Sequence, residues 1–175
     1  MKLLIGYASK EGQTRKIARH IADLAFDTGH SIEIVALVDA SDIEFGRFDA
    51  VLLAAPIHAG HYPKALSQFV SFYQDELQNI QSRFVSVSLA AAGHDAEEWR
   101  SLEHIADDFS QATGWTPSST KHVAGAYMPS KYDILTKFIM RRIVSAKDPD
   151  ASPGEDKEYT DWTDLNASIN SWLNP

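Results

Sequence analysis

A short polar turn near the N-terminus has the residue types of a phosphate-binding site. It follows an apolar run at residues 2–8 and leads into a segment with helical periodicity at residues 12–28. Backbone N–H groups at the start of a helix lack intrahelical partners and lie at the positive end of the helix dipole, so they attract anions. We therefore predict a phosphate site here, formed by Ser9, Lys10, Glu11, Gly12, Gln13 and Thr14. The alternative is an ordinary helix start capped by Ser9.

Two later turns have the composition of loops that enclose a flat ligand. Both follow apolar runs and are rich in small residues, which leave room for a planar ring and expose backbone N–H groups. The histidine and tyrosine rings of the first turn offer stacking faces and hydrogen-bond donors. The two turns are Pro56-Ile57-His58-Ala59-Gly60-His61-Tyr62 and Leu89-Ala90-Ala91-Ala92-Gly93-His94.

His58 and His61 are the candidates for contact with a ligand or for proton transfer in this region. A structural or solvated role is the alternative for each, and no catalytic acid or base is assigned from the sequence. The two histidines are three residues apart but no third metal ligand is evident, so we expect no metal site. The chain has no cysteine, which excludes disulfides, thiolate metal sites and a cysteine nucleophile. Neither a nucleophile elbow nor a triphosphate or dinucleotide glycine motif is present.

The charge and hydropathy of the chain exclude other classes of function. The net charge of −8 argues against general nucleic-acid binding, which needs a basic surface. The N-terminal apolar run is too short for a signal peptide, and no apolar stretch is long enough to cross a bilayer. We therefore expect a protein of the cytoplasm that is soluble or only attached to a membrane surface.

Strand-like and helix-like segments alternate through the chain. This order predicts one α/β domain, residues 1–175, with parallel strands, crossover helices and a doubly wound sheet. Ligands of such sheets bind at the carboxyl ends of the strands, where the three turns lie. We expect strands at 2–8, 31–37, 49–55, 83–90 and 120–127, and helices at 12–28, from Pro63 to Leu77, from Trp99 to Phe109 and from Trp162 to Leu173.

One segment, at about 128–159, interrupts the alternation. It contains a helical pattern at about 132–146 and then an acidic tail with proline and glycine. Residues 131–147 carry a net charge of +4, whereas residues 148–164 carry −6. Loops this long inside a compact domain are usually functional or disordered.

The helix in this insertion has more apolar surface than one packed face needs. One stripe consists of Leu135, Phe138, Ile139, Ile143 and Ala146, with Ile134, Met140 and Val144 outside it. We expect Lys137, Phe138, Arg141 and Arg142 to contact an apolar anionic substrate or an anionic membrane. The alternative is a helix that only covers the edge of the sheet.

Together these motifs resemble the flavodoxin superfamily, in which the first turn holds the phosphate of FMN. The chain is most similar to the menaquinone-dependent protoporphyrinogen IX dehydrogenase family. The resemblance extends over nearly the whole chain and rests on Gly12-Gln13-Thr14-Arg15, Gly60-His61-Tyr62, Ala124 to Tyr127, and Tyr159-Thr160-Asp161-Trp162. It implies a five-stranded parallel sheet of order 2-1-3-4-5 with helices on both faces.

The resemblance also implies a function. The cofactor would be FMN, the donor protoporphyrinogen IX and the acceptor a membrane quinone, in haem biosynthesis, with peripheral contact to the inner face of the cell membrane. In the family the two later turns grip the flavin ring from both sides. The alternatives are a flavodoxin-type electron carrier and an NAD(P)H:quinone reductase of the same fold. The sequence does not specify the oligomeric state.

Overall fold

The computed structural model describes residues 1–152 and 154–174, apart from the side chain of Leu135. Five parallel strands form one sheet in the order β2-β1-β3-β4-β5, which confirms the expected doubly wound topology. The strands are β1 (Lys2–Tyr7), β2 (Ser31–Ala36), β3 (Ala50–Pro56), β4 (Gln81–Ser88) and β5 (Ser119–Ala124). The three central strands β1, β3 and β4 are buried almost throughout, as parallel strands covered on both faces are.

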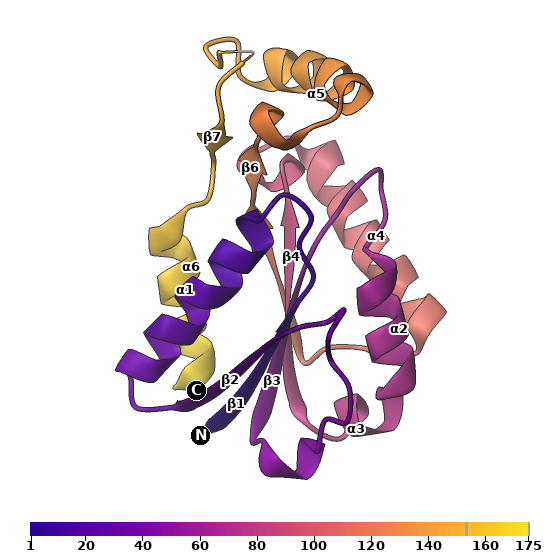
Figure 1. Cartoon of the computed structure of the whole chain (residues 1–175), viewed down its shortest axis with the longest axis vertical. Coiled ribbons are helices and arrows are strands. Elements are labelled where there is room, and N and C mark those ends of the chain that lie inside the picture. Colours follow the sequence, from indigo (N-terminus) through magenta and orange to yellow (C-terminus); the bar gives the residue numbers. More distant parts are fainter. Residues whose placement is uncertain (153, 175) are drawn as a thin grey trace.

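Helices cover both faces of this sheet (Figure 1). One apolar layer joins α1 and α6 to the sheet through residues such as Ile17 and Ile169, and the other joins α2, α3 and α4 through residues such as Leu66 and Phe109. The helices are α1 (Gln13–Asp27), α2 (Lys64–Phe72), α3 (Gln74–Gln78), α4 (Ala96–Thr113) and α6 (Trp162–Leu173), with short 3₁₀ turns at Phe45–Arg47 (η1) and Ala90–Ala92 (η2).

The insertion lies beyond the carboxyl ends of the strands, far from both termini (Figure 1). It comprises β6 (Ala126–Tyr127), the 3₁₀ turn η3 (Pro129–Lys131), α5 (Ile134–Lys147) and β7 (Lys157–Glu158). Strands β6 and β7 pair antiparallel, so the segment leaves and re-enters the domain at one place. The acidic tail connects α5 to β7, and its residue Pro153 lies outside the described residues.

Two expected elements are interrupted in the structure. The helix expected from Pro63 to Leu77 breaks at Tyr73, whose φ of −107° and ψ of 29° separate α2 from α3. The strand expected at 120–127 ends at Ala124, because the N–H of Gly125 bonds to the carbonyl of Ser88 and its carbonyl accepts from Tyr159. A Cβ at Gly125 would lie 3.2 Å from the side chain of Val87, so a glycine lets the chain turn closely past β4.

Candidate ligand-binding cleft

A narrow cleft of about 150 Å³ lies between the carboxyl ends of the strands and the insertion. Its floor comes from the turns after β1 and β3, its back from the ends of β4 and β5, and its roof from η3 and α5. It is lined by Ser9, Lys10, Glu11, Gln13, Thr14, Pro56, Ile57, His58, Ala59, Val87, Ser88, Leu89, Gly125, Ala126, Tyr132, Thr136 and Met140. Pockets that enclose a whole ligand are typically about 300–1,000 Å³, so this cleft is too small to enclose a ligand of that kind completely.

The N-cap residue of helix α1 is a glycine, which has no side chain to cap the helix. This residue, Gly12, has φ of 105° and makes no side-chain cap bond, while the hydroxyl of Ser9 accepts the N–H of Gly12 itself at 3.1 Å. Helices α4, α5 and α6 differ, since an aspartate at the N-cap of each accepts backbone N–H bonds. The first turn of α1 contains no acidic residue. Its N–H groups and helix dipole therefore remain available to an anion.

A lysine of the insertion reaches this turn. The ammonium Nζ of Lys131 donates to the carbonyl of Glu11 at 2.6 Å, and it lies 3.3 Å from the position that a Cβ on Gly12 would take. Sequence reasoning counted Lys131 in the basic insertion and missed this contact, because nothing in the sequence indicates that residues 120 positions apart meet. Lys131 adds a positive charge beside the helix start.

Gln13 connects the turn to the far end of the insertion. Its Nε2 donates to Glu158 and to Thr160, at 2.8 and 2.9 Å, while Oε1 is buried and has no hydrogen-bond partner among the described residues. Glu158 also accepts from Lys16 at 2.5 Å. This network ties the return of the insertion, β7, to the helix that would hold an anion.

The turn after β3 is a tight hairpin that places one histidine in the cleft. The N–H of His58 bonds to the carbonyl of His61 and the reverse bond closes the hairpin, with Ala59 and Gly60 at φ of 48° and 78°. Two consecutive residues with positive φ are typical of a type I′ turn. An alanine in this region is strained, and such strain concentrates at functional sites.

His58 and Glu11 form a pair across the floor of the cleft. Nε2 of His58 lies 3.2 Å from Oε2 of Glu11. Burial raises the pKa of the Glu11 carboxyl, but the hydrogen bond and charge of His58, with a backbone hydrogen bond, outweigh it and lower the pKa below its ordinary value. The carboxylate is therefore positioned to orient the imidazole, as in pairs where a carboxylate orients a proton-transferring histidine.

Some predicted residues of these turns lie away from the cleft. Gly12, Gly60 and His61 are not among its lining residues. Tyr62, expected to offer a ring to the ligand, lies in the core, where its hydroxyl donates to Ser86 at 2.8 Å and its ring contacts Phe84. The sequence expectation for Tyr62 is wrong because this ring completes the aromatic layer under β4.

The turn after β4 contributes only its first residue to the cleft. Leu89 lines it, whereas Ala90 to Gly93 do not. The N–H groups of Ala91, Ala92 and Gly93 are used inside the turn η2, bonding to Ser88, Leu89 and Ala90. Ala92 and Gly93 instead face a second cavity on the other side of Leu89. The expectation that this loop presents its N–H groups to a ring is therefore wrong for Ala91, Ala92 and Gly93.

Helix α5 packs through a different face from the one its sequence indicates. Val144 is buried and Met140 partly buried, in a cluster with Leu89, Tyr127 and Tyr132. The side chains of the expected stripe are exposed: Phe138 is 68% exposed, Ile139 49% and Ile143 41%, while the side chain of Leu135 lies outside the described residues. The stripe is exposed because the tyrosines and Leu89 select the opposite face.

The exposed face of α5 gathers three of the four residues predicted to contact substrate or membrane. Lys137, Phe138 and Arg141 line a shallow groove of about 360 Å³ with Ile134 and Gly154. Arg142 is exposed but lies outside that lining. Apolar and cationic side chains therefore share one surface of the insertion.

The described residues contain no group of three or more His, Cys, Asp or Glu placed to hold a metal ion. None of the helices in the described ranges combines the length and the apolar character needed to cross a bilayer.

The fold and cleft place the chain in a known class. The flavodoxin domain matches residues 4–152, and the chain belongs to this family. Solved structures share the fold: a two-electron reduced flavodoxin of Megasphaera elsdenii has a TM-score of 0.52 at 19% identity, covering 69% of this chain and 84% of that one. A flavodoxin mutant of Pseudomonas aeruginosa has a TM-score of 0.51 at 15% identity, covering 84% and 96%.

Two relatives are similar over most of their length. A protein of Escherichia coli strain K12 named protoporphyrinogen IX dehydrogenase (quinone) is 26% identical over 162 residues, which cover 93% of this chain and 89% of that protein. A protein of the same name from Leishmania major is 26% identical over 162 residues, covering 92% and 70%. The resemblance inferred from the sequence motifs is thereby confirmed.

Proposed function

We propose that the cleft binds FMN and that the protein oxidises protoporphyrinogen IX to protoporphyrin IX, with a quinone as electron acceptor. The observation that carries this proposal is the similarity to the protoporphyrinogen IX dehydrogenases over 93% of the chain. An aligned region of that extent includes most of the insertion, and the insertion forms the roof of the cleft.

Residues in the cleft and beside it fit FMN. The uncapped start of α1, Gly12 at positive φ and the nearby ammonium of Lys131 suit a terminal phosphate monoester. Ala59, Gly125 and Ala126 leave little side-chain bulk where a flat ring would lie. When bound, FMN supplies the redox chemistry, and the protein supplies binding, orientation and electrostatics.

Within this proposal His58 is the proton acceptor and Glu11 its positioning residue. Oxidation of a porphyrinogen removes protons as well as electrons, and His58 is the imidazole in the cleft lining. Its contact with Glu11 fixes the ring at the cleft wall. His61, which lies outside the lining, is the second candidate.

The outer face of α5 is assigned to an anionic membrane surface. Ile134 and Phe138 are 91% and 68% exposed, and Lys137 and Arg141 lie beside them in the same groove. Apolar side chains that enter the headgroup region, flanked by basic ones, are the pattern of peripheral membrane contact. A protein of the cytoplasm would there reach a membrane quinone.

The test has two stages. Calorimetry should show FMN binding at about one per chain, weakened by Thr14→Val, since a hydrogen bond to a charged group contributes about 1.5–3 kcal/mol. Anaerobic incubation of the FMN-loaded protein with protoporphyrinogen IX and a menaquinone analogue should then produce porphyrin fluorescence.

Protein stripped of FMN is the control for porphyrin formation. Absence of FMN binding would overturn the whole proposal. If the protein binds FMN but forms no more porphyrin than the control, the result would favour the alternative of a flavodoxin-type electron carrier. Rapid quinone reduction by NAD(P)H would instead favour the reductase of the same fold.

A further inference from the structure

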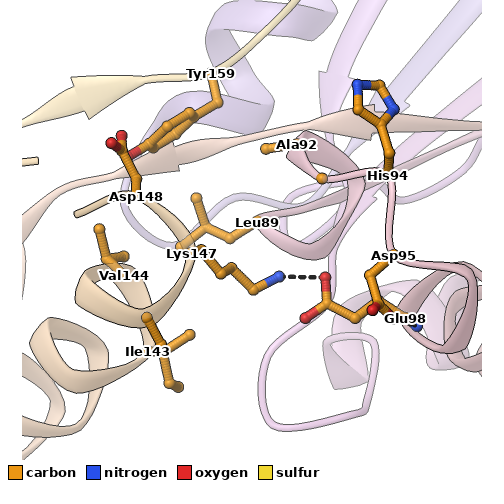
Figure 2. Close-up of a pocket in the computed structure, with 12 residues that line it drawn as sticks. Leu89, Ala92, His94, Asp95, Glu98, Ile143, Val144, Lys147, Asp148 and Tyr159 are labelled. Atoms are coloured by element: carbon orange, nitrogen blue, oxygen red, sulfur yellow. Dashed lines mark hydrogen bonds and ion pairs between the residues drawn. The ribbon is translucent and has the colours of Figure 1, made fainter. Parts of the chain in front are cut away.

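A second cavity, of about 720 Å³, adjoins the cleft on the other side of Leu89. It lies between η2, the start of α4 and the last turn of α5, and Figure 2 shows the side chains that line it. Its volume is in the range of small-molecule sites. Apolar and aromatic groups form much of its wall: Leu89, Ala92, Ile143, Val144, Ala146 and Tyr159.

The charged groups of this cavity are already paired. Lys147 of α5 bonds to Glu98 of α4 at 2.5 Å, the contact dashed in Figure 2. Asp148 accepts from Tyr159 at 2.8 Å and from Lys157. Asp95 caps α4 by accepting the N–H groups of Glu97 and Glu98.

These pairings decide the charge of the ligand that the cavity can take. The three carboxylates and one ammonium of the described lining sum to −2, and Lys157, which pairs with Asp148 from outside the lining, reduces the sum to −1; both ammonium groups are committed to carboxylates. A dianion would face this net negative charge without a free cation, and an unpaired charge away from water is costly. A neutral apolar ring meets the apolar wall without that cost.

The cavity is one layer of side chains from the cleft. Leu89 lines both spaces, Met140 lines the cleft and Val144 lines the cavity. Leu89, Met140 and Val144 pack in one cluster, so they form the partition. A redox ligand in the cavity would therefore lie next to the edge of a ring held in the cleft.

We propose that this cavity is the site of the quinone acceptor. The inference rests on the proposed function and adds to it that the acceptor binds in this cavity, separate from the cleft that contains His58. The bound quinone takes up two electrons and two protons and leaves as the quinol, and the reduced flavin that gives them up returns to its oxidised form.

To test this, the FMN-loaded protein is reduced with dithionite, and its reoxidation by menadione is followed by stopped flow. Ala146→Trp fills the cavity from the exposed end of α5 and should slow the menadione reaction at least tenfold, while FMN affinity and reoxidation by ferricyanide stay unchanged. Ser145→Trp is the matched control, since Ser145 is equally exposed but is not a lining residue; it should behave as the wild type. An anionic naphthoquinone sulfonate should be a poorer acceptor than menadione, more so at low salt.

Photolabelling of the wild-type holoprotein provides a test that does not depend on a variant. An azido-naphthoquinone should label residues 89–94 or 143–148. Labelling confined to 56–61, or unchanged menadione kinetics in Ala146→Trp, would overturn the inference, as would a wild type that menadione does not reoxidise. Because dithionite replaces the porphyrinogen, failure of porphyrinogen oxidation with normal menadione kinetics would refute the proposed function and leave this site standing.

Discussion

A helix lies behind the floor of the cleft and another forms much of its roof, and the two helices are built in opposite ways. Helix α1, behind the floor, buries seven residues between the sheet and α6. Of the described side chains of α5, the roof, only Val144 is buried. The floor is therefore fixed by the core, whereas α5 makes few core contacts and keeps most of its surface for other molecules.

The N-terminal ends of α1 and α5 also differ. The N-cap residue of α1 is Gly12, which has no side chain, and the proposed function assigns the backbone N–H groups there to an anion. The start of α5 is capped by Asp133, which accepts the N–H of Thr136 at 2.8 Å. The groups of α5 that can attract an anion are therefore its lysine and arginine side chains and not its backbone N–H groups. Backbone groups have one geometry and suit one constant ligand, whereas lysine and arginine side chains adapt to a surface or an exchanging substrate. We therefore expect damage to the floor to affect the cofactor and damage to α5 to affect its partners.

The largest effect should come from Gly12→Val. A residue other than glycine at a φ of 105° costs about 1–3 kcal/mol, and the turn would relax to another conformation. Binding of FMN must restore the strained form, so affinity should fall by up to about two orders of magnitude in calorimetry.

Gly29→Val is the matched control for this strain. Gly29 has φ of 90°, ends α1 and has open space around a Cβ. It should lose stability in urea but bind FMN normally. Equal loss of FMN affinity in both variants would show that global strain, not the anion site, is responsible.

An intermediate effect is expected from Arg141→Glu combined with Arg142→Glu. Each basic residue near an anionic membrane contributes about 1 kcal/mol, so association with vesicles containing anionic lipid should weaken at least about 30-fold at low salt. High salt should reduce the difference, because the effect fades within a Debye length. FMN affinity and thermal stability should change little.

Arg19→Glu combined with Arg100→Glu changes the net charge by the same amount from exposed positions on α1 and α4. Vesicle binding should be nearly intact in that control. If both double variants lose vesicle binding equally, the net charge of the protein determines the binding and α5 is not a specific membrane-binding surface. If the α5 variant instead raises only the KM for porphyrinogen, the groove binds the substrate and not the membrane.

The same contrast explains what the sequence could predict. The alternation of strands and helices and the turn after β1 were predictable, because buried strands and the apolar face of α1 produce regular periodicities. The strand order followed from the resemblance to flavodoxins. The breaks at Tyr73 and Gly125 were not predictable, since these residues bond to Ile43 and Tyr159, which are distant in sequence.

The packing face of α5 was mispredicted for a physical reason. Its apolar residues surround the helix, so periodicity alone cannot choose which of them is buried. Tyr127, Tyr132 and Leu89 decide it in favour of Val144. The meeting of Lys131 with Glu11 and the partition at Leu89 likewise arise only when the insertion folds over the strand ends.

The smallest expected effect is a loss of stability at alkaline pH, to which one tyrosine of the core and one of the insertion contribute. Burial raises the pKa of Tyr62 to about 12, against a hydrogen bond to Ser86 that lowers it. The pKa of Tyr159 is also raised to about 12, first by burial and then by the hydrogen bond and charge of Asp148. Between the ordinary value of 10 and these values the unfolded chain binds fewer protons than the native one, so stability should fall as pH rises from about 10 to 12.

Ultraviolet titration of phenolate absorbance in Asp148→Asn should separate the two tyrosines. The charge of Asp148 disfavours ionisation of Tyr159, so its pKa should fall toward 10 by part of the shift, while Tyr62 keeps its value. Tyr159→Phe and Tyr62→Phe assign the two transitions, and each should reduce the alkaline loss of stability measured in urea. If Asp148→Asn leaves both transitions at the same pH, burial alone raises the pKa of Tyr159. The end of α5 would then be held by packing, as the core is, and not by its charged contacts.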